Sequence, residues 1–411
     1  MKSSQNAFMP RDSTFNIPKA ILSRAEAPEK LYRKPFHPLQ TLKNRIESHF
    51  RENVARFKTI DDLDCPAVSV EDNFERLLIS KDHPGRSPSD TYYVNENTVL
   101  RTHTSAHQHR ILQTYSQTDA SRRPDGYLVT ADVYRRDEID PTHYPIFHQM
   151  EGIRLFSRAE ISPGHLPDDI GDDFMGSISS KKSLQSAHSV SEAYFVGMNL
   201  KRCLESLVRE LFAHEKDLQI RWIDAYFPFT SPSWEMEVFY RGKWLELFGC
   251  GVMRQEILDA TGNSDKVAWA FGLGLERISM FLHDIPDIRL FWSEDCRFIN
   301  QFHPSNGQKR PVQFQPYSRF PVCYKDISFW NNDDKRLGET DFYDLVREVA
   351  GDLVESVSLI DEFQHPKTGR QSKCFRIEYR SMDRTVTNKE IDVFQDEIRR
   401  LVQRKWLVEL R

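Results

Sequence analysis

Two arginines in the sequence have the chemistry needed to hold phosphate. Arg135 ends an apolar run that predicts a strand, and Arg277 starts a predicted helix directly after Gly272 and Gly274. A guanidinium group donates two parallel hydrogen bonds to a phosphate, and glycines let a backbone approach a flat ligand closely. The glycine patterns of P-loops and of dinucleotide-binding turns are both missing, so we expect arginines to hold any bound nucleotide. A surface ion pair with Glu276 or a neighbouring acid is the alternative for Arg277.

The segment "VYRRDEIDPTHYPIFHQMEG" concentrates further polar groups around Arg135. Arg136 and His143 can each hold an anion, and an acidic turn separates them. The second half alternates like a strand, which places Gln149 and Glu151 on one face and His148 on the other. We therefore expect Gln149 and Glu151 to meet a ligand and His148 to pack against the protein.

Two short motifs admit both a functional and a structural interpretation. In "RTHTSAHQ", His103 and His107 are four residues apart, but no third metal ligand lies near them in the sequence. A structural or capping role for His107 and a substrate contact for His103 and Ser105 are the two alternatives. In "YFPF", Phe227 and Phe229 share one face of a predicted strand, where they form either part of the core or an aromatic slot.

Hydrophobic periodicity predicts the elements that must position these residues. The hydroxyl of Thr104 or Ser105 is expected to cap a helix that starts there. The predicted helices cover 37–57, 190–214, 275–284, 341–354 and 388–406, and the predicted strands cover 127–136, 144–156, 219–229, 235–241, 243–251, 268–274, 319–330, 356–363 and 373–380.

Composition shifts divide the chain into four parts. Residues 1–34 form an N-terminal extension, 35–302 a first domain with a Ser-, Gly- and Asp-rich insertion loop at 157–190, 303–315 a linker, and 316–411 a second domain. The order strand–helix–strand–strand–helix in the second domain predicts a small ferredoxin-like fold. The expected fold class is α+β.

Bulk properties exclude several classes of protein. The 411 residues carry a net charge of −5, so a nucleic-acid partner would need a local basic surface. No apolar run is long enough to cross a bilayer, and no membrane partner is expected. The six cysteines include no C-x-x-C pair, which argues against a zinc site or a disulfide framework.

The motifs together resemble one enzyme family. The segment from Val133 to Gly152 resembles motif 2 of the class II aminoacyl-tRNA synthetases, and "AFGLGLERISM" resembles their motif 3. The segments "RTHTSAHQ", "YFPFT", "KWLELFGCGVM" and "DIPDIRLF" are similar to those of phenylalanyl-tRNA synthetases. "FPVCYKDISFW" and "FRIEYRSMDRTVT" resemble the ferredoxin-like anticodon-binding domain. The resemblance covers roughly residues 35–411.

The resemblance implies a fold, substrates and roles for individual residues. It implies an antiparallel sheet flanked by helices, ATP and Mg²⁺ as cofactors, and Arg135 and Arg277 as catalytic residues at the α- and γ-phosphates. The implied ATP site comprises Arg135, Asp137, His143, Glu246, Gly274 and Arg277, with Glu246 also a metal ligand and Asp137 standing where relatives often have Glu. The implied phenylalanine site comprises His103, Thr104, Ser105, Gln108, Gln149, Glu151, Phe227, Phe229, Ala270, Phe271 and Gly272.

The C-terminal region offers the local basic surface that a tRNA requires. Residues 364–405 hold eleven Lys and Arg against six Asp and Glu, which could equally be a solvated face of ion pairs. With the resemblance we expect binding of tRNA(Phe) through Arg376, Arg380, Arg384, Arg399, Arg400 and Arg404.

Both domains lie on one chain here. In the family that the sequence resembles, this fusion is typical of the monomeric enzymes of the mitochondrial matrix. The alternatives are an adenylating enzyme for another acid, a non-catalytic tRNA-binding relative, and a cytosolic catalytic subunit.

Overall fold

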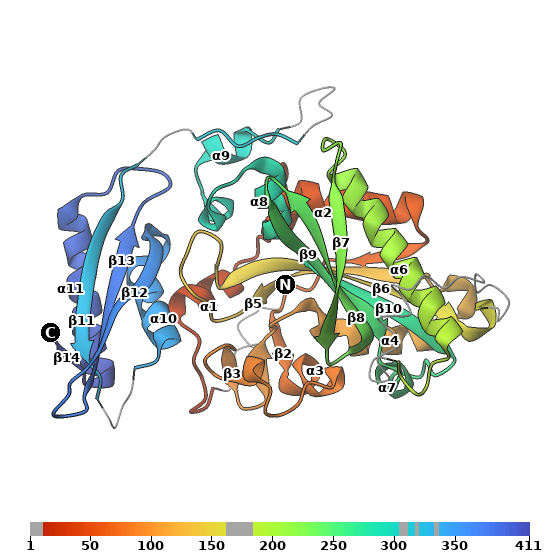
Figure 1. The fold of residues 1–411 in the computed structure, drawn as a ribbon, viewed down its shortest axis with the longest axis horizontal. Coiled ribbons are helices and arrows are strands. Elements are labelled where there is room, and N and C mark those ends of the chain that lie inside the picture. Colours follow the sequence, from red (N-terminus) through yellow and green to blue (C-terminus); the bar gives the residue numbers. More distant parts are fainter. Residues whose placement is uncertain (1–10, 162–183, 304–310, 317–319, 333–336) are drawn as a thin grey trace.

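The computed structural model describes residues 11–161, 184–303, 311–316, 320–332 and 337–411, arranged as two bodies (Figure 1). A seven-stranded sheet with helices around it forms the larger body, and a four-stranded sheet forms the C-terminal body. The predicted α+β class, with a mainly antiparallel sheet flanked by helices, is confirmed.

The large sheet is antiparallel except at one edge, where β1 and β5 run parallel. Successive side chains along each strand point to opposite faces of the sheet, so residues two apart share a face. In spatial order the strands are β1 (Phe57–Ile60), β5 (Gly126–Tyr134), β6 (Ile146–Ser157), β10 (Lys266–Gly274), β9 (Lys243–Met253), β8 (Thr230–Tyr240) and β7 (Gln219–Phe227).

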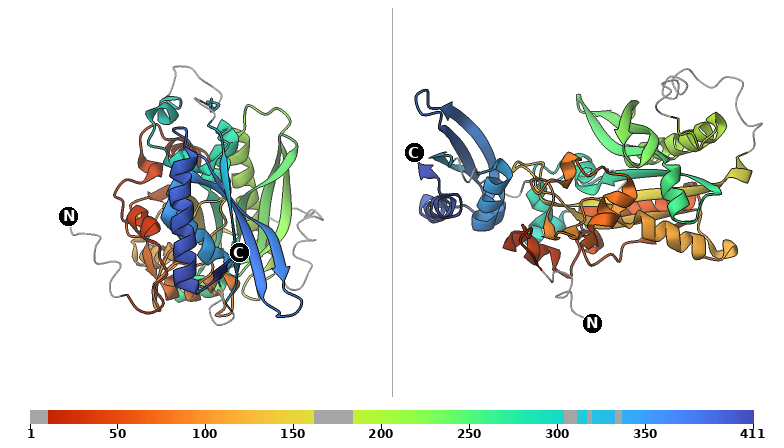
Figure 2. Two further views of the ribbon diagram at one scale, coloured as in Figure 1. Left: turned by 90° about the vertical axis from the view of Figure 1, so that its left-hand side faces the viewer. Right: turned by 90° about the horizontal axis from the view of Figure 1, so that it is seen from below.

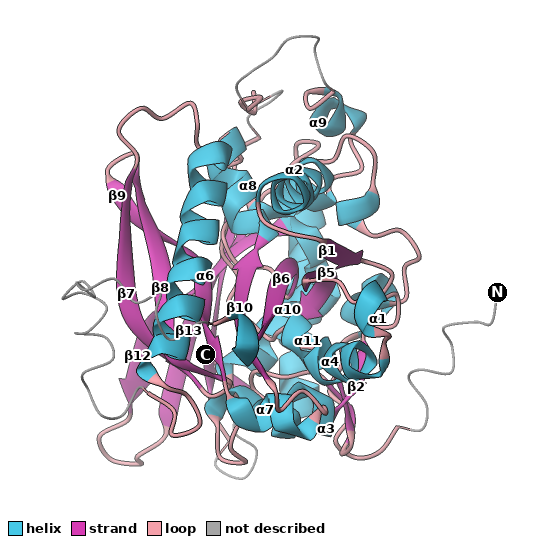
Figure 3. Cartoon of the chain, turned by 90° about the vertical axis from the view of Figure 1, so that its right-hand side faces the viewer, coloured by secondary structure: helices cyan, strands magenta, loops and turns pink. Residues whose placement is uncertain are grey.

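Helices cover both faces of this sheet (Figure 3). One face packs against α2 (Pro38–Asn53), α6 (Val190–Leu211) and α8 (Leu275–His283) in the main core. The other face packs partly against α4 (Gln108–Gln117) and α7 (Gln255–Ala260). The second pair of helices is short and leaves part of its face open.

A three-stranded sheet lies beside the large one. Strands β3 (Tyr93–Asn95) and β4 (Thr98–Leu100) form a hairpin, and β2 (Ala67–Ser69) pairs with β4. The helical segment after β4 has no side-chain cap, so the expected cap by Thr104 or Ser105 is wrong. The remaining short helices of this body are α3 (Val70–Asn73), α9 (Cys296–Asn300), η2 (Leu31–Arg33), η3 (Glu75–Leu77), η4 (Pro84–Arg86), η5 (Thr104–His107), η6 (Ala120–Arg122), η7 (Arg158–Glu160) and η8 (Ile288–Trp292).

The described part of the N-terminal extension is folded onto the larger body. Helix α1 (Lys19–Ala25) places Ile21 in the main core. Further along, the buried Lys30 ammonium lies 2.9 Å from the Asp132 carboxylate. The extension therefore contributes to the same core as the sheet.

The C-terminal body has one strand more than the sequence predicts. Strand β14 (Glu409–Leu410) pairs with β11 and completes a βαββαβ order. Helices α10 and α11 pack on one face of the sheet over a core of its own. The other elements are β11 (Cys323–Trp330), α10 (Glu339–Ala350), η9 (Gly351–Leu353), β12 (Val354–Gln364), β13 (Gln371–Tyr379) and α11 (Asn388–Trp406).

The two bodies lie next to each other (Figure 2), and the loop that joins β5 to β6 contacts the C-terminal body. Arg136, expected to hold an anion, instead donates from Nε to Asp344 of α10 at 2.6 Å. Tyr92 donates to the same carboxylate at 3.0 Å. Ile139 from the loop packs into the C-terminal core. The contact surface between the two bodies, called the docked surface below, is therefore built from both polar and apolar contacts.

Two further expectations can be compared with the described residues. All six cysteines are free thiols, as expected. Among the described helices, none has both the length and the apolar character needed to span a bilayer. Most of the predicted insertion loop, 162–183, and much of the predicted linker, 304–310, lie outside the described residues.

Candidate active site

A cavity of about 1500 Å³ lies over the large sheet, on the part of its face that α4 and α7 do not cover. Its walls come from β6, β9 and β10, from the segment around η5, and from the turn between β7 and β8. The sequence-predicted residues of both substrate sites border this one cavity, although they come from segments far apart in the chain.

Glu151 provides a buried acceptor at the cavity wall. The side chain is only 2% exposed, Ser105 Oγ donates to its carboxylate at 2.8 Å, and Gln108 donates to the other oxygen. Burial raises the pKa of Glu151 to about 7, and the hydrogen bonds from Gln108 and Ser105 oppose that rise. A buried carboxylate held by neutral donors is suited to receive a cation such as an ammonium group.

Gln149 lies two residues before Glu151 on the same face of β6. Its side-chain oxygen accepts a hydrogen bond from the Thr104 backbone nitrogen at 3.3 Å. Both side chains border the cavity, as the strand alternation predicts.

Phe227 and Phe229 form a stacked pair beside this polar end. Their ring centroids are 5.9 Å apart, and the ring planes differ by 16°. Both rings are half-buried and border the cavity, and Phe227 belongs to none of the core clusters of the described chain. Phe229 also packs against two core clusters, so the pair combines both interpretations: both rings border the cavity, and Phe229 contacts the core as well.

Arg135 leaves β5 with its guanidinium group facing the cavity. Nε donates to the Thr102 carbonyl at 2.9 Å, and the guanidinium carbon lies 5.2 Å from the centre of the Phe147 ring. None of the described ion pairs uses Arg135. The group is positioned by neutral contacts and keeps donors for an anion.

Arg277 borders the same cavity from the first turn of α8. Its Nη1 lies 3.4 Å from the Glu246 carboxylate of β9, and both side chains are about half exposed. Glu276 is buried and bound to His148, so it is not the partner; the surface ion pair of Arg277 is made with Glu246 instead. Arg277 borders the cavity from this half-exposed position.

His103 borders the cavity between Arg135 and the Glu151 end. Burial, with the nearby Arg135 and His107 charges, lowers its pKa to about 3. The imidazole is therefore neutral at physiological pH. His107 lies 3.3 Å from Arg101 Nη1, within the buried network around Asp132, in agreement with a structural role.

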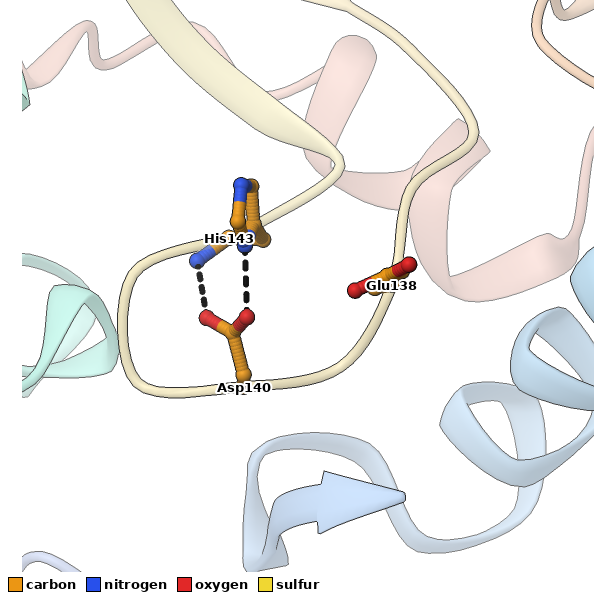
Figure 4. Close-up of side chains that lie close together, drawn as sticks. All are labelled: Glu138, Asp140 and His143. Atoms are coloured by element: carbon orange, nitrogen blue, oxygen red, sulfur yellow. Dashed lines mark hydrogen bonds and ion pairs between the residues drawn. The ribbon is translucent and has the colours of Figure 1, made fainter. Parts of the chain in front are cut away.

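His143 lies in the loop between β5 and β6, where its ring faces an acid (Figure 4). His143 Nδ1 is 2.6 Å from Asp140 Oδ2, and the His143 backbone nitrogen donates to Asp140 Oδ1 at 2.9 Å. Glu138 brings a third possible ligand atom within 4.8 Å. Asp137 borders the cavity too, and its carboxylate accepts a hydrogen bond from the Glu138 backbone nitrogen.

Strand β10 forms the floor of the cavity, with small residues on the open face. Ala270, Gly272 and Gly274 alternate along it, and a Cβ atom at either glycine would meet nothing within 4 Å. The Phe271 ring lies on the opposite face, 5.5 Å from Phe50 in the main core. Phe271 is thus among the residues that border the cavity, although its ring packs in the main core.

The predicted tRNA-binding arginines are spread over different faces of the C-terminal body. Arg376 lies on the open face of the sheet, where it pairs with Asp326 at 2.8 Å. Arg380 pairs with Glu355 at 3.2 Å near the docked surface, and Arg384 pairs with Glu390. The remaining three, Arg399, Arg400 and Arg404, lie on α11, which covers the other face of the sheet.

Sequence reasoning missed two aromatic residues on the cavity wall. Tyr226 and Trp244 both border the cavity. Tyr226 directly precedes the Phe227–Pro228–Phe229 segment, and this position in the sequence could have indicated that it borders the same cavity. Trp244 stands in a hairpin whose register across the sheet could not be read from the sequence.

The arrangement suits the activation of an aromatic amino acid. One end of the cavity offers a carboxylate and an aromatic slot, and the other offers two arginines for phosphate. Family models agree: residues 24–166 and 188–302 match the class II tRNA synthetase core domain (F), and residues 318–411 match the ferredoxin-fold anticodon-binding domain.

Curated relatives narrow the family further. The chain is 46% identical to the mitochondrial phenylalanine–tRNA ligase of Mus musculus, over 93% of this chain and 82% of that protein. The enzymes of the same name from Dictyostelium discoideum and Saccharomyces cerevisiae are 43% and 41% identical, over 96% and 97% of this chain and 89% and 92% of theirs. The chain belongs to the class II aminoacyl-tRNA synthetases and, within them, to the phenylalanine–tRNA ligases.

Proposed function

We propose that this chain joins phenylalanine to tRNA(Phe) in mitochondria, with both chemical steps in the one cavity. In the first step phenylalanine and ATP give phenylalanyl-adenylate and pyrophosphate. In the second step the phenylalanyl group passes to the 3′-terminal adenosine, and AMP leaves. The observation that carries this proposal is that the Glu151 carboxylate and the stacked Phe227–Phe229 pair border the same cavity.

Phenylalanine is the amino acid that fits this adjacency. The ammonium group would bind Glu151, with Gln149, Ser105 and His103 around it. The ring would enter the slot, where aromatic pairs gain about 0.5–1.5 kcal/mol beyond area burial. Ala270 leaves space at the floor of the slot, and Thr104 and Gln108 hold the polar end in place.

ATP would span the other half of the cavity. Arg135 would hold the α-phosphate, and Arg277 would hold the γ-phosphate. In-line attack by the amino-acid carboxylate on the α-phosphorus needs positioning and charge stabilisation more than an acid or base. Gly274 and Asp137 would border the nucleotide, and His143 would reach the departing phosphates after leaving Asp140.

Mg²⁺ fits at Glu246. Mg²⁺ is usually held by one or two carboxylates together with substrate phosphates. Glu246 faces the cavity beside Arg277, and partial burial together with the nearby Glu246 charge raises the pKa of Glu235. Two neighbouring carboxylates favour a divalent cation, which would neutralise the triphosphate charge.

Glu246→Gln tests this magnesium site. The substitution should raise the Mg²⁺ concentration needed for half-maximal pyrophosphate exchange. An unchanged Mg²⁺ requirement would exclude Glu246 as a ligand.

The division of labour follows the two bodies. We assign activation and transfer to 35–302 and anticodon recognition to 316–411, joined by 303–315, with the chain acting as a monomer in the mitochondrial matrix. Charge reversal of Arg399, Arg400 and Arg404 should raise the KM for tRNA and leave pyrophosphate exchange intact. The same reversal at Arg376 tests the open face of the sheet, and light scattering of the free protein tests the monomer.

One experiment separates this function from its rivals. Pyrophosphate exchange is measured with a panel of amino acids, and aminoacylation is measured with a mitochondrial tRNA(Phe) transcript and this chain alone. Phenylalanine should give the highest kcat/KM, and the transcript should be charged. Preference for another acid would support a different adenylating enzyme, and lack of exchange would support a non-catalytic relative.

A further inference from the structure

Tyr226 is the most exposed of the large hydrophobic side chains in the described chain, at 83%. It stands one residue before the end of β7, at a register shift in the pairing of β7 with β8: Ala225 pairs with Ser233, and the next paired residue is Phe227. A single exposed ring needs no explanation by itself. A bulge beside a functional site, however, often serves to re-aim a side chain.

The re-aimed ring stands at the entrance of the cavity. Tyr226 borders it together with Phe227 and Phe229, but only Tyr226 is fully open to solvent. The neighbouring slot is already formed by the two phenylalanines. The Tyr226 ring is therefore free to meet a ligand that approaches from outside.

Only one substrate of the reaction must reach the cavity from outside as an extended chain. In the proposed function phenylalanine and ATP are small molecules that would bind inside the cavity, whereas the 3′ end of the tRNA is single-stranded and attached to a large body. Single-stranded bases bind proteins by stacking on aromatic side chains, and every base has a π-face.

We propose that Tyr226 is a stacking platform for one base of the single-stranded 3′ end of the tRNA. The inference rests on the proposed function and adds a positioning residue for the transfer step. By stacking, Tyr226 would fix the path of the terminal nucleotides, so that the 3′-terminal ribose meets the adenylate. The phenolic hydroxyl is not needed for this role, because the ring face makes the contact.

Three substitutions separate stacking from simple apolar contact. Tyr226→Phe keeps the ring, Tyr226→Leu keeps an apolar side chain without a ring, and Tyr226→Ala removes both. Because the residue is exposed, all three should fold with an unchanged melting temperature. Tyr226→Ala and Tyr226→Leu should raise the KM for tRNA about 5- to 100-fold, whereas Tyr226→Phe should stay near wild type.

Pyrophosphate exchange provides the independent readout. Exchange parameters for phenylalanine and ATP should be unchanged in all three variants. A raised KM for phenylalanine in exchange would mean that Tyr226 closes over the amino acid, and it would overturn the proposal. An unchanged KM for tRNA in Tyr226→Ala would also overturn it. Loss of exchange in the wild type itself would count against the proposed function instead.

Modified transcripts identify the stacked base. Abasic nucleotides are placed singly at each of the last three positions of the tRNA and are tested with the wild type and with Tyr226→Ala. At the stacked position, the abasic transcript should impair the wild type but not impair Tyr226→Ala further, because coupled groups give non-additive effects. Additive losses at all three positions would overturn the proposal.

Discussion

His148 and Glu276 form a buried pair behind the cavity, with His148 Nδ1 2.5 Å from Glu276 Oε1. The His148 backbone nitrogen donates to the other carboxylate oxygen at 2.9 Å. His148 lies between Gln149 and Phe147 on β6, and Glu276 directly precedes Arg277 on α8. The pair therefore joins β6, which carries Gln149, to α8, which carries Arg277.

Removal of His148 should destabilise the larger body. His148→Ala would leave the buried Glu276 carboxylate without its ring partner and would remove the imidazole that packs against Tyr32 and Trp292. Leaving a buried polar group without its hydrogen-bond partner costs about 1–3 kcal/mol, and more for a charged group. Urea unfolding at neutral pH measures the loss. Arg277→Ala is the control: its half-exposed pair with Glu246 should cost less than about 1 kcal/mol, although pyrophosphate exchange should fail. Equal stability losses would contradict the assignment.

Phenylalanine binding should weaken in acid through Glu151. Its carboxylate, with a pKa of about 7 in the empty site, must be charged to hold an ammonium group. The dissociation constant for phenylalanine should rise roughly tenfold per pH unit as pH falls below 7. Calorimetric titrations between pH 6 and 8.5 test this. Glu151→Gln should bind weakly at every pH, and a flat wild-type profile would contradict the role.

The Glu151 carboxylate should lower the free energy of unfolding in alkaline solution. The folded pKa of about 7 lies above the ordinary value of 4.5, so folding binds protons and stability falls as pH rises between these values. Above pH 7 the full cost is present, up to about 3 kcal/mol. In the absence of phenylalanine, Glu151→Gln should therefore be more stable than wild type at pH 8 and similar at pH 4.5. A variant less stable at pH 8 would contradict this sign.

Gly249 should control the width of the aromatic slot. A Cβ atom at this position would lie 2.8 Å from Phe227 Cζ, so Gly249→Ala must push the ring toward the slot. The KM for phenylalanine in pyrophosphate exchange should rise roughly tenfold, whereas the KM for ATP should not change. If the effect passes through the ring, adding Phe227→Leu should give a non-additive result. Additive effects would place the cause elsewhere.

Asp344 should hold the two bodies together. Its buried carboxylate accepts hydrogen bonds from Arg136 and Tyr92, whereas the C-terminal core is formed by other residues. Asp344→Ala should loosen the docking, and small-angle scattering should show a larger radius of gyration. Asp392→Ala removes an exposed pair with Lys325 inside the C-terminal body and should leave the radius unchanged. A common increase in both variants would contradict a specific role for Asp344.

Much of the site could be predicted because it depends on local patterns. The alternation of β6 placed Gln149 and Glu151 together, and the two-residue spacing placed Phe227 beside Phe229. The helical period of α6 and the short hairpin of β8 with β9 were equally local.

Other features could not be predicted because they depend on contacts between distant segments. Ser105 donates to Glu151 of β6, 46 residues further along the chain, and does not cap a helix. Phe271 faces the core because of the register of β10 with β6. Strand β14 is too short to show a period, and only its pairing with β11 reveals it.

The loop between β5 and β6 has a consequence for how the chain can be divided. It carries Asp137 and His143 at the cavity, and it also places Ile139 in the C-terminal core. Arg347 of α10 donates to the Glu138 carbonyl of the same loop. The C-terminal body is thus not a detachable module: cutting the chain before residue 316 would strip the loop of its packing. If this loop were replaced by that of a relative, the α10 residues that contact it would have to be replaced as well.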